Sequence, residues 1–132
     1  MSTIAVLSIA VMGIMLFLLG ANVTRERAMR GDTGNQMPSG DPTDRLLIAQ
    51  RAHGNAAEYV PTLIGLIIVC STLTDGWWLD TLCIIATASR VLHAGSMLAG
   101  KSLATHWPYR DVAATVTYLA GAALGVTAIV SL

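Results

Sequence analysis

Charged residues are scarce in this sequence, and their scarcity excludes most soluble folds. Lys, Arg, Asp and Glu together make up 12% of the 132 residues, whereas soluble domains carry about 25%. Hydrophobic residues make up 54%, and they are gathered in long runs. This composition indicates an integral membrane protein of one domain. The formal net charge is zero, so the charge balance gives no reason to expect binding to nucleic acid.

Cysteine is also rare, since Cys70 and Cys83 are the only two in the chain. Each lies inside an apolar run, where a free thiol usually behaves as a small hydrophobic side chain. Two such residues favour neither a disulfide framework nor a metal centre. No spacing of His, Cys and carboxylate residues resembles a metal site, so we predict none.

What the sequence does contain is four runs of apolar residues. A helix of about 20 residues crosses the roughly 30 Å hydrocarbon core of a bilayer, and each run reaches that length. The runs are too long and too continuous for barrel strands, so they predict an all-α membrane protein. We expect a single four-helix bundle over residues 1–132, with membrane spans at about 4–23, 44–74, 77–98 and 109–131.

Basic residues of the connecting segments predict how the chain is oriented. They lie in the first and third connections and are absent from the second, TDGWWLD. Connections rich in Lys and Arg stay in the cytoplasm, so we expect both termini outside. Trp77 and Trp78 then fit the outer interface and Trp107 the inner one. The basic cluster RERAMR follows the first run instead of preceding it, which predicts a retained helix and not a cleaved signal peptide.

The first connection predicts a turn region that leads into the second helix. Its sequence, RERAMRGDTGNQMPSGDPTD, is rich in Gly, Pro, Asp and Asn. Asp41, Thr43 and Asp44 are candidates to cap the second helix, and Pro42 lies near its first turn.

Polar residues form a stripe on the cytoplasmic half of the second span. Successive residues of a helix turn by about 100°, so Arg51, Asn55 and Glu58 fall within about 60° of one another. His53 points to roughly the opposite side of the helix and does not join this stripe.

The third span carries a second polar face at a similar depth. Arg90, His93 and Met97 share this face by the same arithmetic, and Arg110 opens the fourth helix at that level. Ionisable residues within spans are costly and usually face a bundle interior or a wet cavity. We therefore expect the two polar faces to converge on one cavity that opens toward the cytoplasm.

Two interpretations of these charges remain open. Arg90 and Glu58 can form a structural ion pair while Arg51 reaches lipid phosphates. Alternatively the residues bind a ligand, because one acid is accompanied by at least three bases. Arginine binds carboxylates in bidentate fashion and a carboxylate binds ammonium groups, so the set suits a small zwitterion with extra carboxylates.

Two segments resemble the MAPEG proteins, the membrane-associated proteins of eicosanoid and glutathione metabolism. They are RAHGNAAEYVP at 51–61, followed by an apolar run, and SRVLHAG at 89–95. The RGDTG sequence of the first connection is similar to the short bacterial branch of that family. The resemblance covers most of the chain. It implies a homotrimer of four-helix subunits in a bacterial inner membrane, with glutathione between neighbouring subunits near the cytoplasmic side.

The resemblance also implies which residues bind the cofactor. Six residues would bind glutathione: Arg51, Asn55, Glu58, Tyr59, Arg90 and His93. The two arginines would bind its carboxylates, the asparagine its peptide group and the glutamate its γ-glutamyl ammonium. Pro61 would kink the second helix beneath the pocket, because proline removes a backbone hydrogen bond.

Turnover in the family requires a cation that stabilises the glutathione thiolate. The resemblance assigns this role to Arg110, with Lys101 as the alternative, since a nearby cation lowers the pKa of a thiol. The eicosanoid-handling members carry a tyrosine one turn beyond the position of His93, where this chain has Met97. Binding of glutathione is therefore better supported than turnover.

These features together predict a glutathione-binding membrane enzyme of the transferase or peroxidase type, which acts on an apolar electrophile from the bilayer. A non-catalytic membrane subunit with a vestigial anion pocket is one alternative. A small proton-coupled exporter is another, although Glu58 lies near the cytoplasmic edge of its span and among arginines that would repel cationic cargo.

Overall fold

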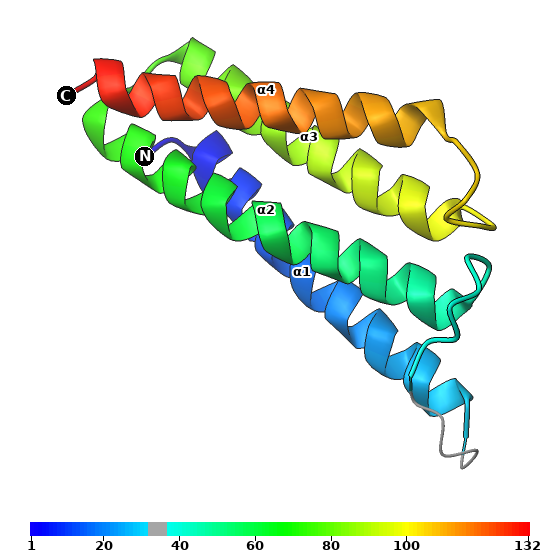
Figure 1. Cartoon of the computed structure of the whole chain (residues 1–132). Coiled ribbons are helices and arrows are strands. Elements are labelled where there is room, and N and C mark those ends of the chain that lie inside the picture. The colour runs from blue at the N-terminus through cyan, green and yellow to red at the C-terminus, as the bar shows by residue number, and fades with distance from the viewer. Residues whose placement is uncertain (32–36) are drawn as a thin grey trace.

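Four helices make up the fold, and their bounds lie close to those of the apolar runs. The computed structural model describes residues 1–31 and 37–132, so part of the RGDTG sequence lies outside the described residues. Each helix is long and apolar enough to cross a membrane, which confirms the predicted all-α, four-span architecture. In chain order the helices are α1 (Thr3–Met29), α2 (Arg45–Leu73), α3 (Trp77–Ala99) and α4 (Pro108–Val130) (Figure 1).

The first helix continues beyond the apolar stretch that ends near Val23. Arg, Glu, Ala and Met occupy the next turns and are good helix formers, so α1 ends only at Met29. Gly31 follows with a positive φ of 62°. Its N–H donates to the carbonyl of Ala28 at 3.1 Å and so satisfies one of the last helix carbonyls. The start of the first connection is therefore helical.

The helices pack as a bundle in which α2 and α3 touch each other and both outer helices. Within the described residues α1 and α4 make no direct contact. Consecutive helices run antiparallel, so the two termini and the α2–α3 turn lie at one end of the bundle (Figure 1). The α1–α2 and α3–α4 connections lie together at the other end, where Leu103 N–H donates to the carbonyl of Pro42 at 2.9 Å.

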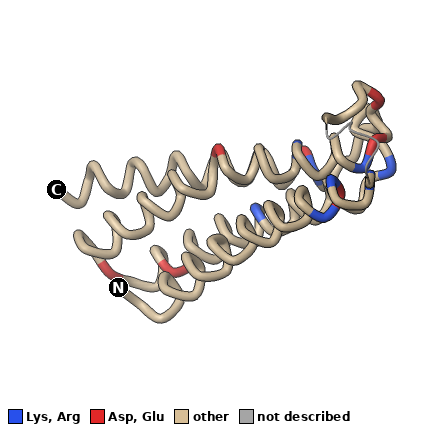
Figure 2. Tube along the Cα trace, turned by 90° about the horizontal axis from the view of Figure 1, so that it is seen from below, with Lys and Arg blue, Asp and Glu red and all other residues tan. Residues whose placement is uncertain are grey.

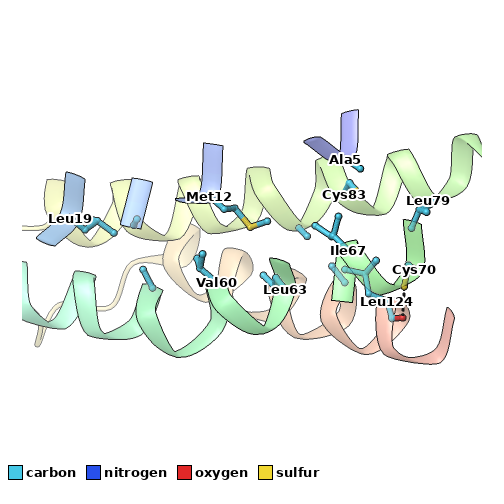
Figure 3. Close-up of a cluster of buried hydrophobic side chains, with 14 of the residues drawn as sticks. Ala5, Met12, Leu19, Val60, Leu63, Ile67, Cys70, Leu79, Cys83 and Leu124 are labelled. Atoms are coloured by element: carbon cyan, nitrogen blue, oxygen red, sulfur yellow. Dashed lines mark hydrogen bonds between the residues drawn. The ribbon is translucent and has the colours of Figure 1, made fainter. Parts of the chain in front are cut away.

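The centre of the bundle is filled by aliphatic and sulfur-containing side chains (Figure 3). Met12, Val60 and Ile67 are fully buried there. Cys70 and Cys83 are also buried and are free thiols; the thiol of Cys70 donates to the Leu124 carbonyl of α4 at 3.2 Å. Lipid tails are as apolar as these side chains, so the hydrophobic effect does not drive the helices together in a bilayer. Close packing of this kind is what holds the bundle together.

Charged residues are concentrated at the end that holds the α1–α2 and α3–α4 connections (Figure 2). Arg51 and Arg90 lie within spans, and the other six of the eight basic residues lie in or beside these two connections. The opposite end carries Asp75 and Asp80 and no basic residue. The charge asymmetry on which the predicted orientation rests is therefore present in the folded chain.

Asp44, one of the three candidates from the sequence, caps the start of α2. Its carboxylate accepts from the N–H of Leu46 at 2.9 Å and from the N–H of Ser39 at 2.6 Å. It also forms an ion pair with Arg30 at the end of α1. These interactions hold the pKa of Asp44 well below its usual range, with the contact to Arg30 as the largest cause. One carboxylate thus caps α2 and ties it to α1.

Candidate functional site

The polar stripe of α2 lines a cavity of about 340 Å³ between α2 and α3. Its position follows from local helix geometry, because α2 continues without a break through Pro61 and keeps the stripe on one face. Gln50 and Gly54, which the sequence analysis did not single out, belong to the same wall. The lining residues are Leu47, Gln50, Arg51, Gly54, Asn55, Glu58 and Met97.

Two opposite charges stand at separate points of this cavity. Arg51 and Glu58 are both exposed, and in the described part of the chain neither belongs to an ion pair. They are seven positions apart, which is about 10 Å along a helix. The cavity therefore offers a cation and an anion that do not neutralise each other, with Asn55 between them.

Arg90 of α3 lies behind the wall of the cavity. Its side chain is only 1% exposed. One guanidinium nitrogen, Nη2, donates to Oδ1 of Asn55 at 2.7 Å, and the guanidinium carbon lies 5.2 Å from the centre of the Tyr59 ring. Its Nε–H has no hydrogen-bond partner. The carbonyl of the Asn55 amide is thus committed to Arg90, and its NH2 group remains available to the cavity.

Within the described residues, no carboxylate forms an ion pair with the buried Arg90. The described ion pairs all involve other arginines or a histidine, although Glu58 is close enough to act on Arg90 electrostatically. A structural Arg90–Glu58 ion pair, the ligand-free interpretation of these residues, is therefore not formed in the single chain. A buried cation without a counter-ion is costly, and an anion in the adjoining cavity would reduce that cost.

Met97 lines the cavity, whereas His93 does not. Met97 lies about 20° from Arg90 around α3 and His93 about 60° from it in the same direction, so the two residues are only about 40° apart. His93 is buried, and its Nδ1 has no hydrogen-bond partner. His93 is therefore buried within the bundle and does not line the cavity.

Tyr59 pairs with a tyrosine that the sequence analysis did not single out. Its ring centre lies 5.6 Å from that of Tyr118 in α4, and their hydroxyl oxygens are 3.5 Å apart. Between these helices lies an apolar cavity of about 270 Å³, lined by Tyr59, Thr62, Leu63, Leu66, Thr117, Tyr118, Gly121 and Ala122. Tyr118 could have been found from the sequence as a polar phenol within the fourth apolar run.

The two candidates for thiolate stabilisation lie outside both cavities. Arg110 is half-buried in the first turn of α4; its Nε is 3.9 Å from Oδ1 of Asp111 and its Nη2 donates to the carbonyl of Thr105 at 3.5 Å. Lys101 is exposed in the α3–α4 connection. In the single chain neither cation lines the wall that carries Asn55.

His53 points away from the cavity, as its helical angle predicts. A Cβ atom built on Gly20 of α1 would lie 3.4 Å from the imidazole Nε2 of His53, so the ring rests against the backbone of α1. His53 is thus a packing residue between α1 and α2.

Comparison of the sequence with models of protein families identifies its family. The MAPEG family model matches residues 1–130. The chain belongs to the MAPEG family. None of the curated proteins compared with it matches. The family includes glutathione-dependent transferases and peroxidases as well as non-catalytic members, so membership establishes an integral membrane protein of a glutathione-associated family.

Proposed function

We propose that this MAPEG protein binds glutathione in the α2–α3 cavity and uses its thiolate against an apolar electrophile. The observation that carries the proposal is the pair of separated, unpaired charges, Arg51 and Glu58, on one wall. Glutathione has two carboxylates and one ammonium group and therefore needs both signs of charge. The volume of about 340 Å³ falls within the usual range of small-molecule sites.

Each polar residue of the wall has a role in this proposal. Arg51 binds a carboxylate and Glu58 binds the γ-glutamyl ammonium, both as charge-assisted hydrogen bonds. Asn55 donates its NH2 group to a peptide carbonyl of the ligand. Arg90 is a positioning residue, because it is buried and acts through Asn55. Tyr59 supports Arg90 from the other side.

The apolar co-substrate has a place beside this site. Glu58 and Tyr59 are consecutive residues, and they line the polar α2–α3 cavity and the apolar α2–α4 cavity respectively. A lipophilic electrophile that enters the α2–α4 cavity from the bilayer would therefore approach the glutathione site along α2. Tyr118 would contact it there.

We infer that the working site requires more than one chain. Arg51 and Glu58 are exposed at the cavity wall, and Arg110 and Lys101 lie outside it. In a homotrimer, a neighbouring subunit would close the cavity and bring a cation toward the sulfur of glutathione. Arg110 is our choice for that cation and Lys101 the alternative. Native mass measurement in mild detergent should give three times the 13.9 kDa mass of the chain; a protein that stays monomeric would contradict this inference.

Calorimetric titration of the detergent-solubilised protein with glutathione tests the proposed ligand. Replacing Arg51 or Glu58 by Ala removes one charge-assisted contact and should weaken binding by about 10- to 150-fold. Arg27→Ala, which removes an exposed charge on α1, serves as the matched control and should bind like the wild type. Wild-type protein without measurable affinity for glutathione would overturn the proposal.

Thiolate formation is tested separately by ultraviolet absorbance of the bound ligand near neutral pH. Arg110→Ala should leave binding nearly intact and suppress the thiolate signal, whereas Lys101→Ala should leave both unchanged. The reverse result would transfer the role to Lys101.

A non-catalytic MAPEG member is the second candidate, and one observation favours it. Met97 lines the cavity at the position where eicosanoid-handling members carry a tyrosine, and a thioether has no proton to donate. If glutathione binds without any thiolate signal in the wild type, the cavity is a binding site only.

A further inference from the structure

A second surface of the molecule, between α1 and α3, is hollowed and almost entirely apolar. One cavity of about 420 Å³ lies between Val11–Leu19 on α1 and Val91–Leu98 on α3. A further cavity of about 540 Å³ shares Val11 and Val91 with the first and continues to Ile4 at the end of the bundle that holds the termini. Together they form one groove, which we call the α1–α3 groove.

The groove is not filled by the protein's own side chains. Gly95 lines it and is exposed, and a Cβ atom built there would meet no heavy atom within 4 Å. Leu18, Val91 and Ile14, which border it, are all exposed. Because α1 and α3 both span the membrane, this empty space must be occupied in a bilayer by something apolar.

The guanidinium of Arg45 lies at the charged end of the groove. Nη1 of Arg45 donates to the carbonyl of Leu98, a groove residue, at 3.4 Å. Arg45 is exposed, and in the part of the chain that the structure describes it has no carboxylate partner. The neighbouring Asp44 is already engaged by Arg30. The remaining N–H groups of Arg45 are therefore available to an anion at the level of the lipid headgroups.

We propose that the α1–α3 groove seats an acyl chain of an anionic phospholipid whose phosphate binds Arg45. The part of the groove nearest Arg45 runs from Leu98 to Val91 along α3, about 10 Å, and the adjoining cavity continues it to a depth greater than one leaflet of about 15 Å. Basic residues cluster at this end of the bundle, and anionic lipids are attracted to such a surface. This site is independent of the proposed glutathione site.

Native mass spectrometry of the intact protein tests the headgroup part of the proposal. The probes are phosphatidylglycerol and phosphatidylcholine with identical acyl chains. We expect the wild type to prefer the anionic lipid by about five-fold, which is the effect of one basic residue near a membrane surface. Arg45→Gln should abolish the preference and Arg45→Lys should keep most of it.

Arg27→Gln provides the matched control for charge. Arg27 lies nine residues beyond Leu18 on α1, which is about half a turn around the helix and away from the groove. The Arg27→Gln variant should therefore retain the wild-type preference for the anionic lipid. If Arg27→Gln and Arg45→Gln lose this preference equally, the anionic lipid is attracted by the overall surface charge and not by a contact with Arg45. That result would overturn the proposal.

Gly95→Leu tests the acyl-chain part, because the added side chain enters open space in the groove. It should reduce the retention of both lipids several-fold. Gly125→Leu is the control: a Cβ atom at Gly125 also meets nothing within 4 Å, and Gly125 lines neither cavity of the groove. The proposal fails if Gly95→Leu retains as much lipid as the wild type. It also fails if Gly95→Leu changes the mass of the oligomer but leaves the amount of bound lipid unchanged, because the groove would then not bind lipid.

Discussion

Arg90 places a charge inside a bundle whose other buried residues are mostly small and apolar. Its guanidinium is held by the amide of Asn55 and the ring of Tyr59, both from α2. In a span, such a residue needs its partners, since water does not replace them. The contact between Arg90 and Asn55 therefore connects the packing of α2 on α3 with the orientation of a side chain in the candidate site.

Asn55→Ala should destabilise the protein by about 2 kcal/mol. Hydrogen bonds between neutral groups of membrane helices contribute about 0.6 kcal/mol on average, but here the deletion leaves a buried cation without its acceptor, which costs more. Unfolding by denaturing detergent measures the change. Gln50→Ala, on the same wall and without a side-chain hydrogen bond in the described structure, should cost less than about 0.5 kcal/mol.

Asn55→Asp separates the structural role from the ligand-binding role. The new carboxylate would pair with Arg90 and keep stability near that of the wild type, yet it would present no N–H to the cavity. Binding of glutathione should fall while the unfolding midpoint is retained. Equal stability of Asn55→Ala and Gln50→Ala would show that Arg90 does not depend on Asn55.

At the scale of the elements, the ends of α1 and α2 are joined by one carboxylate. Asp44 caps α2 and pairs with Arg30 beyond the end of α1. Because the pKa of Asp44 is lowered in the folded protein, its contribution to stability is fully present above its ordinary pKa of 3.8. That contribution is lost as the pH falls below this value toward the lower pKa of the folded state.

Asp44→Asn should therefore lower stability by about 1 kcal/mol at neutral pH, because Asn still caps a helix but cannot pair with Arg30. The difference from the wild type should stay constant from about pH 8 to pH 5 and shrink below about pH 4. Asp41→Asn is the control without an ion pair: in the described residues the Asp41 carboxylate accepts only from the N–H and the hydroxyl of Thr43. These two bonds also lower the pKa of Asp41, so this variant should lose less stability than Asp44→Asn over the same pH range. Thermal unfolding in detergent at several pH values measures the stability of both variants against that of the wild type. A difference that persists unchanged to pH 3 would contradict the assigned role of the ion pair.

At the scale of the whole molecule, the asymmetry of charge predicts the orientation in the membrane. Labelling of single cysteines with a membrane-impermeant maleimide tests it, and the native Cys70 and Cys83 are buried and should stay unlabelled. On intact cells Asp75→Cys should react and Ser102→Cys should not, because basic connections stay in the cytoplasm. Inverted vesicles should show the opposite pattern. Reaction of Ser102→Cys on intact cells would show that the chain has the opposite orientation.

The sequence by itself determined the number of helices, their approximate bounds and the shared face of Arg51, Asn55 and Glu58. These are local properties: the length of an apolar run sets whether a helix can span a bilayer, and the helical repeat sets which neighbours share a face. The bound that differed most was the end of α1, where helix formers continue past the last apolar residues and so extend the helix without extending the span.

The tertiary structure alone decided which residues of α3 and α4 meet that face. Met97 lines the cavity, Arg90 lies behind it, His93 is buried outside the lining, and Tyr118 joins Tyr59. Each of these depends on the rotation of one helix about its axis relative to another. In lipid the apolar pattern of a span does not set that rotation, because core and solvent are equally apolar. Close fit and a few polar contacts across four helices set it, and those involve residues far apart in the chain.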